Sequence, residues 1–157
     1  MESKIKTLEE IKKIVKKLRK EKKKIVFTNG CFDILHVGHI RLFKQARAFG
    51  DVLILGLNSD ESIKKIKSDE RPIIDESDRA EILENLESID YIIFFNESTP
   101  INLISQIKPD FLVKGKDYVE SEVVGKEIVE SNGGIVKLID FVDEKSTSKI
   151  IDKIKKL

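Results

Sequence analysis

The chain has 157 residues, of which 40% are hydrophobic, so it is long enough to enclose one hydrophobic core. Its 29 basic and 28 acidic side chains leave a net charge of +1, which excludes the strong overall field typical of proteins that bind nucleic acids or anionic membranes. One cysteine excludes an internal disulfide, and no apolar run approaches the length of a signal peptide or transmembrane helix, so we expect a cytoplasmic protein with a small, locally bound partner.

The first half of the chain alternates helical and strand patterns. Thr7 and Glu10 have the spacing of a capping box, and apolar residues then recur at helical intervals. The strands are nearly continuous apolar runs, which is typical of parallel strands buried on both faces. In chain order, the patterns predict a helix at 8–20, a strand at 24–29, a helix at 38–49, a strand at 51–58, and a helix capped by Ser59 that ends near Lys67.

The second half continues the alternation. Thr99 is the predicted N-cap of a helix whose first residue is Pro100, and Asn132-Gly133-Gly134 predicts a left-handed C-cap. The predicted elements are a helix at 76–86, a strand at 91–95, a helix at 100–107, a strand at 111–115, a helix at 121–131, a strand at 135–141 and a helix at 146–157.

This order of elements predicts an α/β fold with an open parallel sheet covered by helices on both faces. Because no linker, repeat or low-complexity tract interrupts it, we expect a single domain over residues 1–157, with the N-terminal helix (residues 1–22) packing on the core. In such sheets ligands bind at the carboxyl ends of the strands.

Both histidines of the chain, His36 and His39, flank Gly38 at one of these strand ends, where a helix begins. Helix N-termini attract anions, and imidazoles add hydrogen-bond donors, so the spacing predicts a phosphate site. Three alternatives stay open at this point. The pair could be polar residues satisfied within a turn, it could bind zinc although a third ligand is missing, or Cys31 could act as a nucleophile rather than as a small residue at a crowded strand end.

The segment GCFDILHVGH resembles the signature of the nucleotidyltransferase superfamily built around an H-x-G-H element, in particular its cytidylyltransferase-like branch. Within that branch the segments LNSDESIKKIK, KPDFLVKGKDY, VVGKEIVESNGG and STSKII resemble the adenylyltransferases of ADP-heptose synthesis. The resemblance implies a Rossmann-like fold. It also implies a reaction in which a sugar phosphate attacks the α-phosphorus of a nucleoside triphosphate and displaces pyrophosphate, which requires no nucleophilic side chain.

The resemblance further implies roles for residues near the strand ends. His36, His39 and Lys67 are the expected catalytic residues, with Lys67 preferred over Lys64 and Lys65. The expected nucleotide contacts are Cys31, Phe32, His36, Gly38, His39, Gly115, Asp117, Ser146, Thr147 and Ser148. The expected contacts with the second substrate are Asp33, Arg71, Arg79 and Lys114.

Several of these residues also have simpler interpretations. Asp33 is expected to be an exposed carboxylate that organises the reacting groups, but it could instead cap a helix or serve a turn. Arg71 and Arg79 are candidates because a guanidinium binds two phosphate oxygens at once, although Arg79 could equally pair with Asp75 or Glu76. One residue of Ser146–Ser148 must cap the terminal helix, whatever else it contacts.

The predicted activity is therefore adenylyl transfer from ATP to D-glycero-D-manno-heptose 1-phosphate, giving ADP-heptose for lipopolysaccharide. A CTP-dependent transferase acting on glycerol 3-phosphate or another phosphorylated alcohol, and an FMN adenylyltransferase, are alternatives of the same chemistry. A nucleotide-binding module without catalysis is an alternative of another class. We expect Mg²⁺ to accompany the triphosphate without dedicated protein ligands, and we expect a homodimer that binds neither nucleic acid nor membrane.

Overall fold

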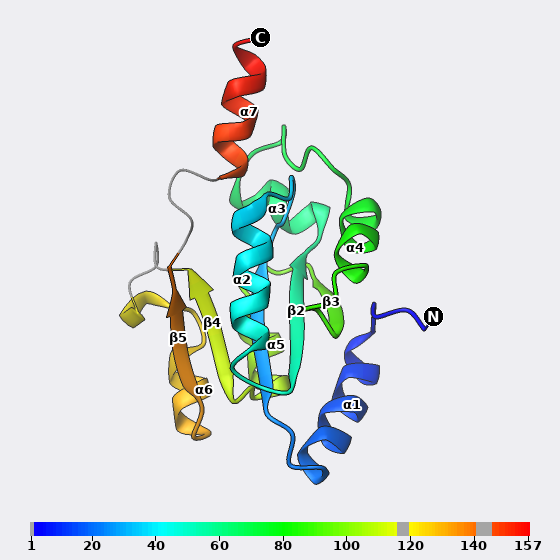
Figure 1. Ribbon diagram of the computed structural model, residues 1–157, viewed down its shortest axis with the longest axis vertical. Coiled ribbons are helices and arrows are strands. Elements are labelled where there is room, and N and C mark those ends of the chain that lie inside the picture. The colour runs from blue at the N-terminus through cyan, green and yellow to red at the C-terminus, as the bar shows by residue number, and fades with distance from the viewer. Residues whose placement is uncertain (1, 116–119, 141–145) are drawn as a thin grey trace.

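A computed structural model describes residues 2–115, 120–140 and 146–157 of the chain (Figure 1). Its five strands form one parallel sheet in the order β3-β2-β1-β4-β5, which confirms the predicted Rossmann-like architecture. The strands are β1 (Ile25–Gly30), β2 (Val52–Asn58), β3 (Tyr91–Phe95), β4 (Phe111–Gly115) and β5 (Ile135–Ile139). The order reverses after β3, so the carboxyl ends of the central strands β1 and β4 border the crevice in which such folds bind ligands.

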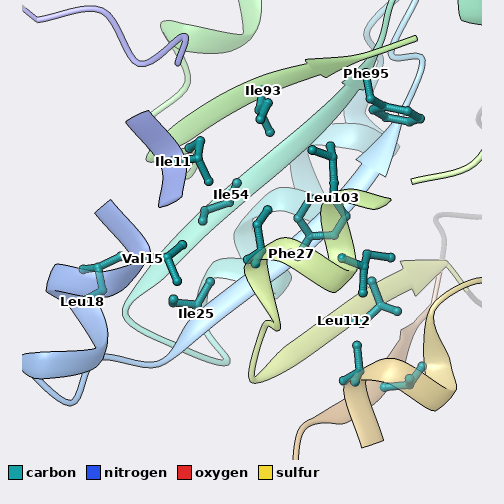
Figure 2. Close-up of a cluster of buried hydrophobic side chains, with 14 of the residues drawn as sticks. Ile11, Val15, Leu18, Ile25, Phe27, Ile54, Ile93, Phe95, Leu103 and Leu112 are labelled. Carbon is teal, nitrogen blue, oxygen red and sulfur yellow. The ribbon is translucent and has the colours of Figure 1, made fainter. Parts of the chain in front are cut away.

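Helices cover both faces of the sheet, as predicted. Buried side chains of α1, α5 and α6 pack on one face, part of which Figure 2 shows, and those of α2 and α4 pack on the other. The helices are α1 (Leu8–Lys20), α2 (Val37–Arg47), α3 (Asp60–Ile66), α4 (Glu76–Glu84), α5 (Ile101–Ile107), α6 (Lys126–Ser131) and α7 (Thr147–Lys155), with a 3₁₀ turn at Glu120–Glu122. Figure 1 shows α7 extending beyond the carboxyl ends of the strands.

The apolar runs of the sequence are explained by burial on both sides of the sheet. Ile25 and Phe27 of β1 belong to the core on the α1 side, whereas Val26 between them belongs to the core on the α2 side, and all three are fully buried. Burial of one such side chain stabilises the fold by roughly 1.5–3 kcal/mol relative to an exposed one. A strand with two buried faces has no polar alternation, which is why the pattern is continuous.

The N-terminal segment does more than the predicted packing of a helix. The capping box of Thr7 and Glu10 is present, and Ile11, Val15 and Leu18 of α1 enter the core. Before the helix, the N–H of Lys6 donates to the carbonyl of Ile92 at 2.8 Å, so residues next to α1 extend the sheet at its β3 edge. None of the helices in the described ranges is long and apolar enough to span a bilayer.

Two predicted helix starts were wrong. The helix predicted from Pro100 begins at Ile101, because Pro100, with φ −84° and ψ 16°, is itself the N-cap in place of Thr99. The helix predicted over 121–131 is reduced to α6 because Gly125 adopts φ +90°, a left-handed conformation that ends the preceding turn. A Cβ at Gly125 would lie 2.6 Å from Cδ1 of Ile104, so glycine allows this turn to approach α5. The predicted ends of the other elements agree to within a few residues, except that the last residue of the strand predicted over 135–141 lies outside the described residues.

The C-cap predicted at Asn132-Gly133-Gly134 is confirmed. Gly133 has φ +81°, its N–H donates to the carbonyl of Glu130 at 3.0 Å, and the N–H of Gly134 donates to the carbonyl of Val129 at 2.8 Å. This is the hydrogen-bond pattern of a Schellman motif, which satisfies the last carbonyls of α6 and directs the chain into β5.

Replacing Gly133 tests this backbone requirement without a steric effect, since a Cβ there would meet no atom within 4 Å. We expect Gly133→Ala to lower the free energy of unfolding by about 1 kcal/mol in urea titrations, because the left-handed conformation disfavours a Cβ. Gly133→Asn is the matched control and should cost less, since asparagine tolerates this conformation. Equal stability of glycine and alanine at this position would contradict the assignment.

Candidate active site

A cavity of about 660 Å³ opens at the carboxyl edge of the sheet. Its walls come from the ends of β1, β2 and β4 and from the starts of α2, α5 and α7. The volume lies in the range of small-molecule sites. The cavity therefore occupies the place where the topology predicts a ligand.

The cavity is lined by more cations than anions. Four basic side chains, Lys67, Arg71, Lys114 and Lys149, face one carboxylate, that of Asp33, among the described lining residues. Of the three lysines considered after β2, only Lys67 lines the cavity, whereas Lys64 and Lys65 lie on the exposed surface of α3. This surplus of positive charge favours an anionic ligand.

His36 and His39 form a stacked pair at the N-terminus of α2. Their ring centroids are 3.8 Å apart, with an interplanar angle of 28°. The N–H of Gly38 donates to Nδ1 of His36 at 3.1 Å, and the N–H of His36 donates to Nδ1 of His39 at 3.3 Å. Because both Nδ1 atoms accept, each neutral ring must carry its proton on Nε2. The backbone thus makes Nε2 of each histidine a hydrogen-bond donor.

His39 is neutral at physiological pH. Burial, and then the neighbouring His36, lower the pKa of His39 to about 4. Phe32 contributes to this environment, since its ring meets that of His39 edge to face with centroids 5.2 Å apart. His39 is therefore placed to donate a hydrogen bond as an imidazole, and the charge of the cavity comes from the lysines and Arg71.

Phe32 also has an unusual backbone conformation. Its φ is +48°, a left-handed value that costs a bulky residue roughly 1–2 kcal/mol. Its ring is buried against Phe43 and His39, which offsets that cost. The sharp turn at Phe32 lies between Cys31, whose carbonyl accepts a hydrogen bond, and Asp33, whose side chain enters the protein.

The expectation of an exposed carboxylate at Asp33 was wrong. The side chain of Asp33 is 1% exposed, and it accepts hydrogen bonds from the backbone N–H groups of Ile73 and Ile74 and from Nε of Arg71. The turn interpretation comes closer, because the carboxylate organises a loop. That loop is distant in sequence and carries Arg71 to the cavity wall.

Arg79 was wrongly expected to clamp a phosphate. It is 1% exposed, does not line the cavity, and pairs with Asp60 at 2.8 Å, not with Asp75 or Glu76. Its other hydrogen bonds run to the main-chain carbonyls of Cys31, Asn58 and Ile74. The guanidinium of Arg79 therefore makes its hydrogen bonds within the protein, and these bonds connect the segments beneath the cavity.

The other predicted residues fall around the cavity. Lys114 is largely buried and donates to the carbonyl of Asn29 at 3.2 Å, and Gly115 ends β4 beside it. Ser146 caps α7, as expected for one of the three hydroxyl residues, while Thr147 donates to the carbonyl of Ile34 at 2.9 Å. Cys31, Phe32 and Ser148 also line the cavity. Gly38 is buried in the first turn of α2, and Asp117 lies outside the described residues.

The alternatives of zinc and of a cysteine nucleophile gain no support from the geometry. Burial raises the pKa of the Cys31 thiol, which opposes formation of the thiolate. Within the ranges described, no group of three His, Cys, Asp or Glu side chains is arranged to hold a metal ion. The donors of the cavity are suited to phosphate oxygens.

Several residues that line the cavity were not predicted from the sequence, among them Asn29, Asn58, Thr99 and Lys149. Asn29 and Asn58 are polar residues at the ends of buried strands, a signal that could have identified them. Oδ1 of Asn29 is buried without a hydrogen-bond partner in the described structure, whereas Nδ2 of Asn58 donates to Ser62 at 2.9 Å. Thr99 and Lys149 had no local signal, because their approach to the cavity depends on the packing of α5 and α7.

Residues 27–153 match the family model described as cytidylyltransferase-like. Among curated proteins, "Bifunctional protein HldE" of Aliarcobacter butzleri (strain RM4018) is 56% identical over 97% of this chain and 31% of that protein. The protein of the same name from Geobacter metallireducens is 54% identical over 98% of this chain and 31% of that protein. The chain thus spans less than a third of the length of these relatives.

Two solved structures share the fold. The lipopolysaccharide core biosynthesis protein from Thermoplasma volcanium GSS1 superposes with a TM-score of 0.64 at 27% identity, covering 78% of this chain and 99% of that one. Pantoate-beta-alanine ligase from Francisella tularensis gives a TM-score of 0.61 over 99% of this chain and 79% of that one. At 17% identity this second likeness shows the fold alone.

The low pKa of His39 predicts a pH dependence of stability. The unfolded chain binds a proton on this residue near pH 6.5 and the folded chain only near pH 4, so the stability present above pH 6.5 is lost as the pH falls toward 4. We expect NMR titration to give a pKa of about 4 for His39. The loss in unfolding free energy from pH 7.5 to 5 should be on the order of 1–2 kcal/mol smaller in His39→Gln. A titration of His39 near pH 6.5 would contradict this assignment.

Proposed function

The chain belongs to the cytidylyltransferase-like family, and from that premise we propose that it is a nucleotidyltransferase that joins a nucleoside monophosphate to a phosphorylated substrate. The observation that carries the proposal is the pair of Nε2 donors of His36 and His39 in a cavity with a surplus of cations. Two polyanions must share the site in such a reaction, and a cavity of about 660 Å³ lined by four basic residues is suited to them.

We propose ATP and D-glycero-D-manno-heptose 1-phosphate as the substrates. The support is the identity of 54–56% to two HldE proteins along nearly the whole of this chain, together with the segments KPDFLVKGKDY and STSKII. These relatives favour the heptose substrate over the alternatives of CTP with glycerol 3-phosphate and of FMN. The product would be ADP-heptose, for use in lipopolysaccharide.

In the proposed reaction an oxygen of the sugar phosphate attacks the α-phosphorus of ATP. The bond between the α-phosphorus and the bridging oxygen breaks, and pyrophosphate leaves with the electron pair. The neutral imidazole of His39, together with His36, donates through Nε2 to phosphate oxygens as charge develops, and Lys67 neutralises that charge. The thiol of Cys31 takes no part, since the attacking atom belongs to the substrate.

Further contacts follow from the lining of the cavity. Gly115, Ser146 and Ser148 are proposed nucleotide contacts, with the N-terminus of α7 contributing main-chain donors. Lys114 is proposed to contact the second substrate. The Thr147 hydroxyl already donates its hydrogen to the carbonyl of Ile34. A nucleotide would therefore contact Thr147 through its main chain, or would donate a hydrogen bond to its hydroxyl oxygen.

We propose Mg²⁺ as the accompanying ion, bound by phosphate oxygens and water. The residues fit this arrangement, because the described part of the cavity offers cations and imidazole donors to phosphates. The carboxylate of Asp33 already accepts hydrogen bonds from Arg71 and Ile73, so the ion would be bound by phosphate oxygens and water. When bound, Mg²⁺ neutralises charge on the triphosphate. Location in the cytoplasm, absence of nucleic acid and formation of a homodimer stay predictions, and sedimentation would test the last.

Pyrophosphate release with a panel of nucleotides and acceptors tests the substrates. We expect turnover with ATP, dependent on heptose 1-phosphate and Mg²⁺, to exceed turnover with CTP and glycerol 3-phosphate or with FMN. Turnover with CTP would select the alternative substrates, and nucleotide binding without turnover on any acceptor would support a module without catalysis.

Variants of the site test the assigned donors in the same assay. His39→Ala and Lys67→Ala should each lower kcat by roughly 10²–10³-fold, which is typical for removal of one donor to a developing charge. Lys64→Ala is the matched control, since Lys64 lies on α3, three residues before Lys67, and does not line the cavity. Full activity of His39→Ala would overturn the proposed mechanism.

A further inference from the structure

The loop before α4 is attached to the turn after β1 by the carboxylate of Asp33. Oδ1 of Asp33 accepts from the N–H of Ile74 at 2.8 Å, and Oδ2 accepts from the N–H of Ile73 at 2.8 Å. Oδ2 also accepts from Nε of Arg71 at 3.0 Å. One carboxylate thus fixes both the main chain of the loop and the orientation of its arginine.

Arg79 holds the same loop from the other side. Its Nε donates to the carbonyl of Ile74 at 3.0 Å, and its Nη1 donates to the carbonyl of Cys31 at 2.7 Å. Ile74 is therefore bound through its N–H to Asp33 and through its carbonyl to Arg79. Both anchors connect the loop to the short turn Cys31–Asp33, which leads directly to the histidine pair.

Arg71 is the member of this arrangement that reaches the cavity. Its side chain lines the cavity and is 15% exposed, whereas that of Asp33 is 1% exposed. Asp33 takes only the Nε–H of Arg71, and no hydrogen-bond partner of the two Nη groups is found among the described residues. A guanidinium that is held at Nε still has its two Nη groups free of that bond, and these can donate two hydrogen bonds to one phosphate.

We propose that Asp33 is a positioning residue that acts through Arg71, and that the Nη groups of Arg71 bind a substrate phosphate in the cavity. This inference rests on the proposed function, because it assumes that phosphates enter the cavity. It replaces the expectation that Asp33 itself contacts the substrate. Holding Arg71 in advance removes the cost of ordering a long side chain when the phosphate binds.

A double-mutant cycle tests the coupling. We expect Asp33→Asn and Arg71→Lys each to lower kcat/KM by roughly 10- to 100-fold, since a shift of about 1 Å can have an effect of this size. The double variant should be no worse than the poorer single variant, because the proposed effect of Asp33 on turnover passes through the Arg71 guanidinium, which Arg71→Lys removes. A rise in KM for ATP would place Arg71 on the triphosphate, and a rise in KM for the sugar phosphate would place it on the acceptor.

The pair of Arg47 and Asp90 provides a matched control. Nε of Arg47 lies 2.9 Å from Oδ2 of Asp90, and the same oxygen accepts the N–H of Leu53 at 2.8 Å. Neither residue lines the cavity. Asp90→Asn should therefore lower Tm without lowering kcat/KM. Losses that multiply in the double variant, or an Asp33→Asn variant as active as Asp90→Asn, would overturn the proposal.

Binding of inorganic pyrophosphate separates this inference from the proposed function. If the wild type binds pyrophosphate but releases none from any substrate pair, the proposed function fails. The double-mutant cycle of Asp33 and Arg71 can then be measured from the dissociation constants for pyrophosphate. If Asp33→Asn does not fold, the wild type still gives a test by NMR. Pyrophosphate or a sugar 1-phosphate should then shift the Nη signals of Arg71 and leave its Nε–H bound to Asp33. Arg71 signals that respond to neither ligand would overturn the proposal.

Discussion

The buried guanidinium of Arg79 is the constraint on which the carboxyl edge of the sheet depends. Strand ends at this edge leave carbonyls without partners in the sheet, and those of Cys31 and Asn58 accept hydrogen bonds from Arg79. A buried cation requires compensation, which comes from Asp60 at the start of α3. The arrangement joins the ends of β1 and β2, the start of α3 and the loop before α4. Arg79 therefore fixes the segments that form the base of the cavity without lining the cavity itself.

The fold was readable from the sequence wherever local patterns and tertiary packing agree. Continuous apolar strands, the capping box of Thr7 and the glycine C-cap at Gly133 each depend on residues a few positions apart, and each is present. The helix starts near Pro100 and Gly125 were misjudged for another reason. Pro100 is compatible both with a cap and with a first helical turn, and the left-handed Gly125 follows from contact with Ile104 on another helix.

The site shows the same division. The position of His36 and His39 followed from their spacing at a strand end, and the resemblance supplied the distant segments. The roles of Asp33 and Arg79 could not be predicted, because their partners lie 38–41 and 5–48 residues away, respectively. A carboxylate or guanidinium near a strand end has the same local sequence whether it faces a ligand or the interior. Only the loop that packs over it decides between the two.

The hydrogen bond from Thr147 to Ile34 spans 113 positions of the chain, so the cavity is closed by its two most distant parts. α7 contributes no buried residue, which means that little of the hydrophobic core retains it there. A ligand that touches the starts of both α2 and α7 is then a cross-link between them. By mass action such a ligand stabilises the closed arrangement by about 2.7 kcal/mol at one hundred times its Kd. A bound nucleotide would thus give α7 the contacts that the hydrophobic core does not provide.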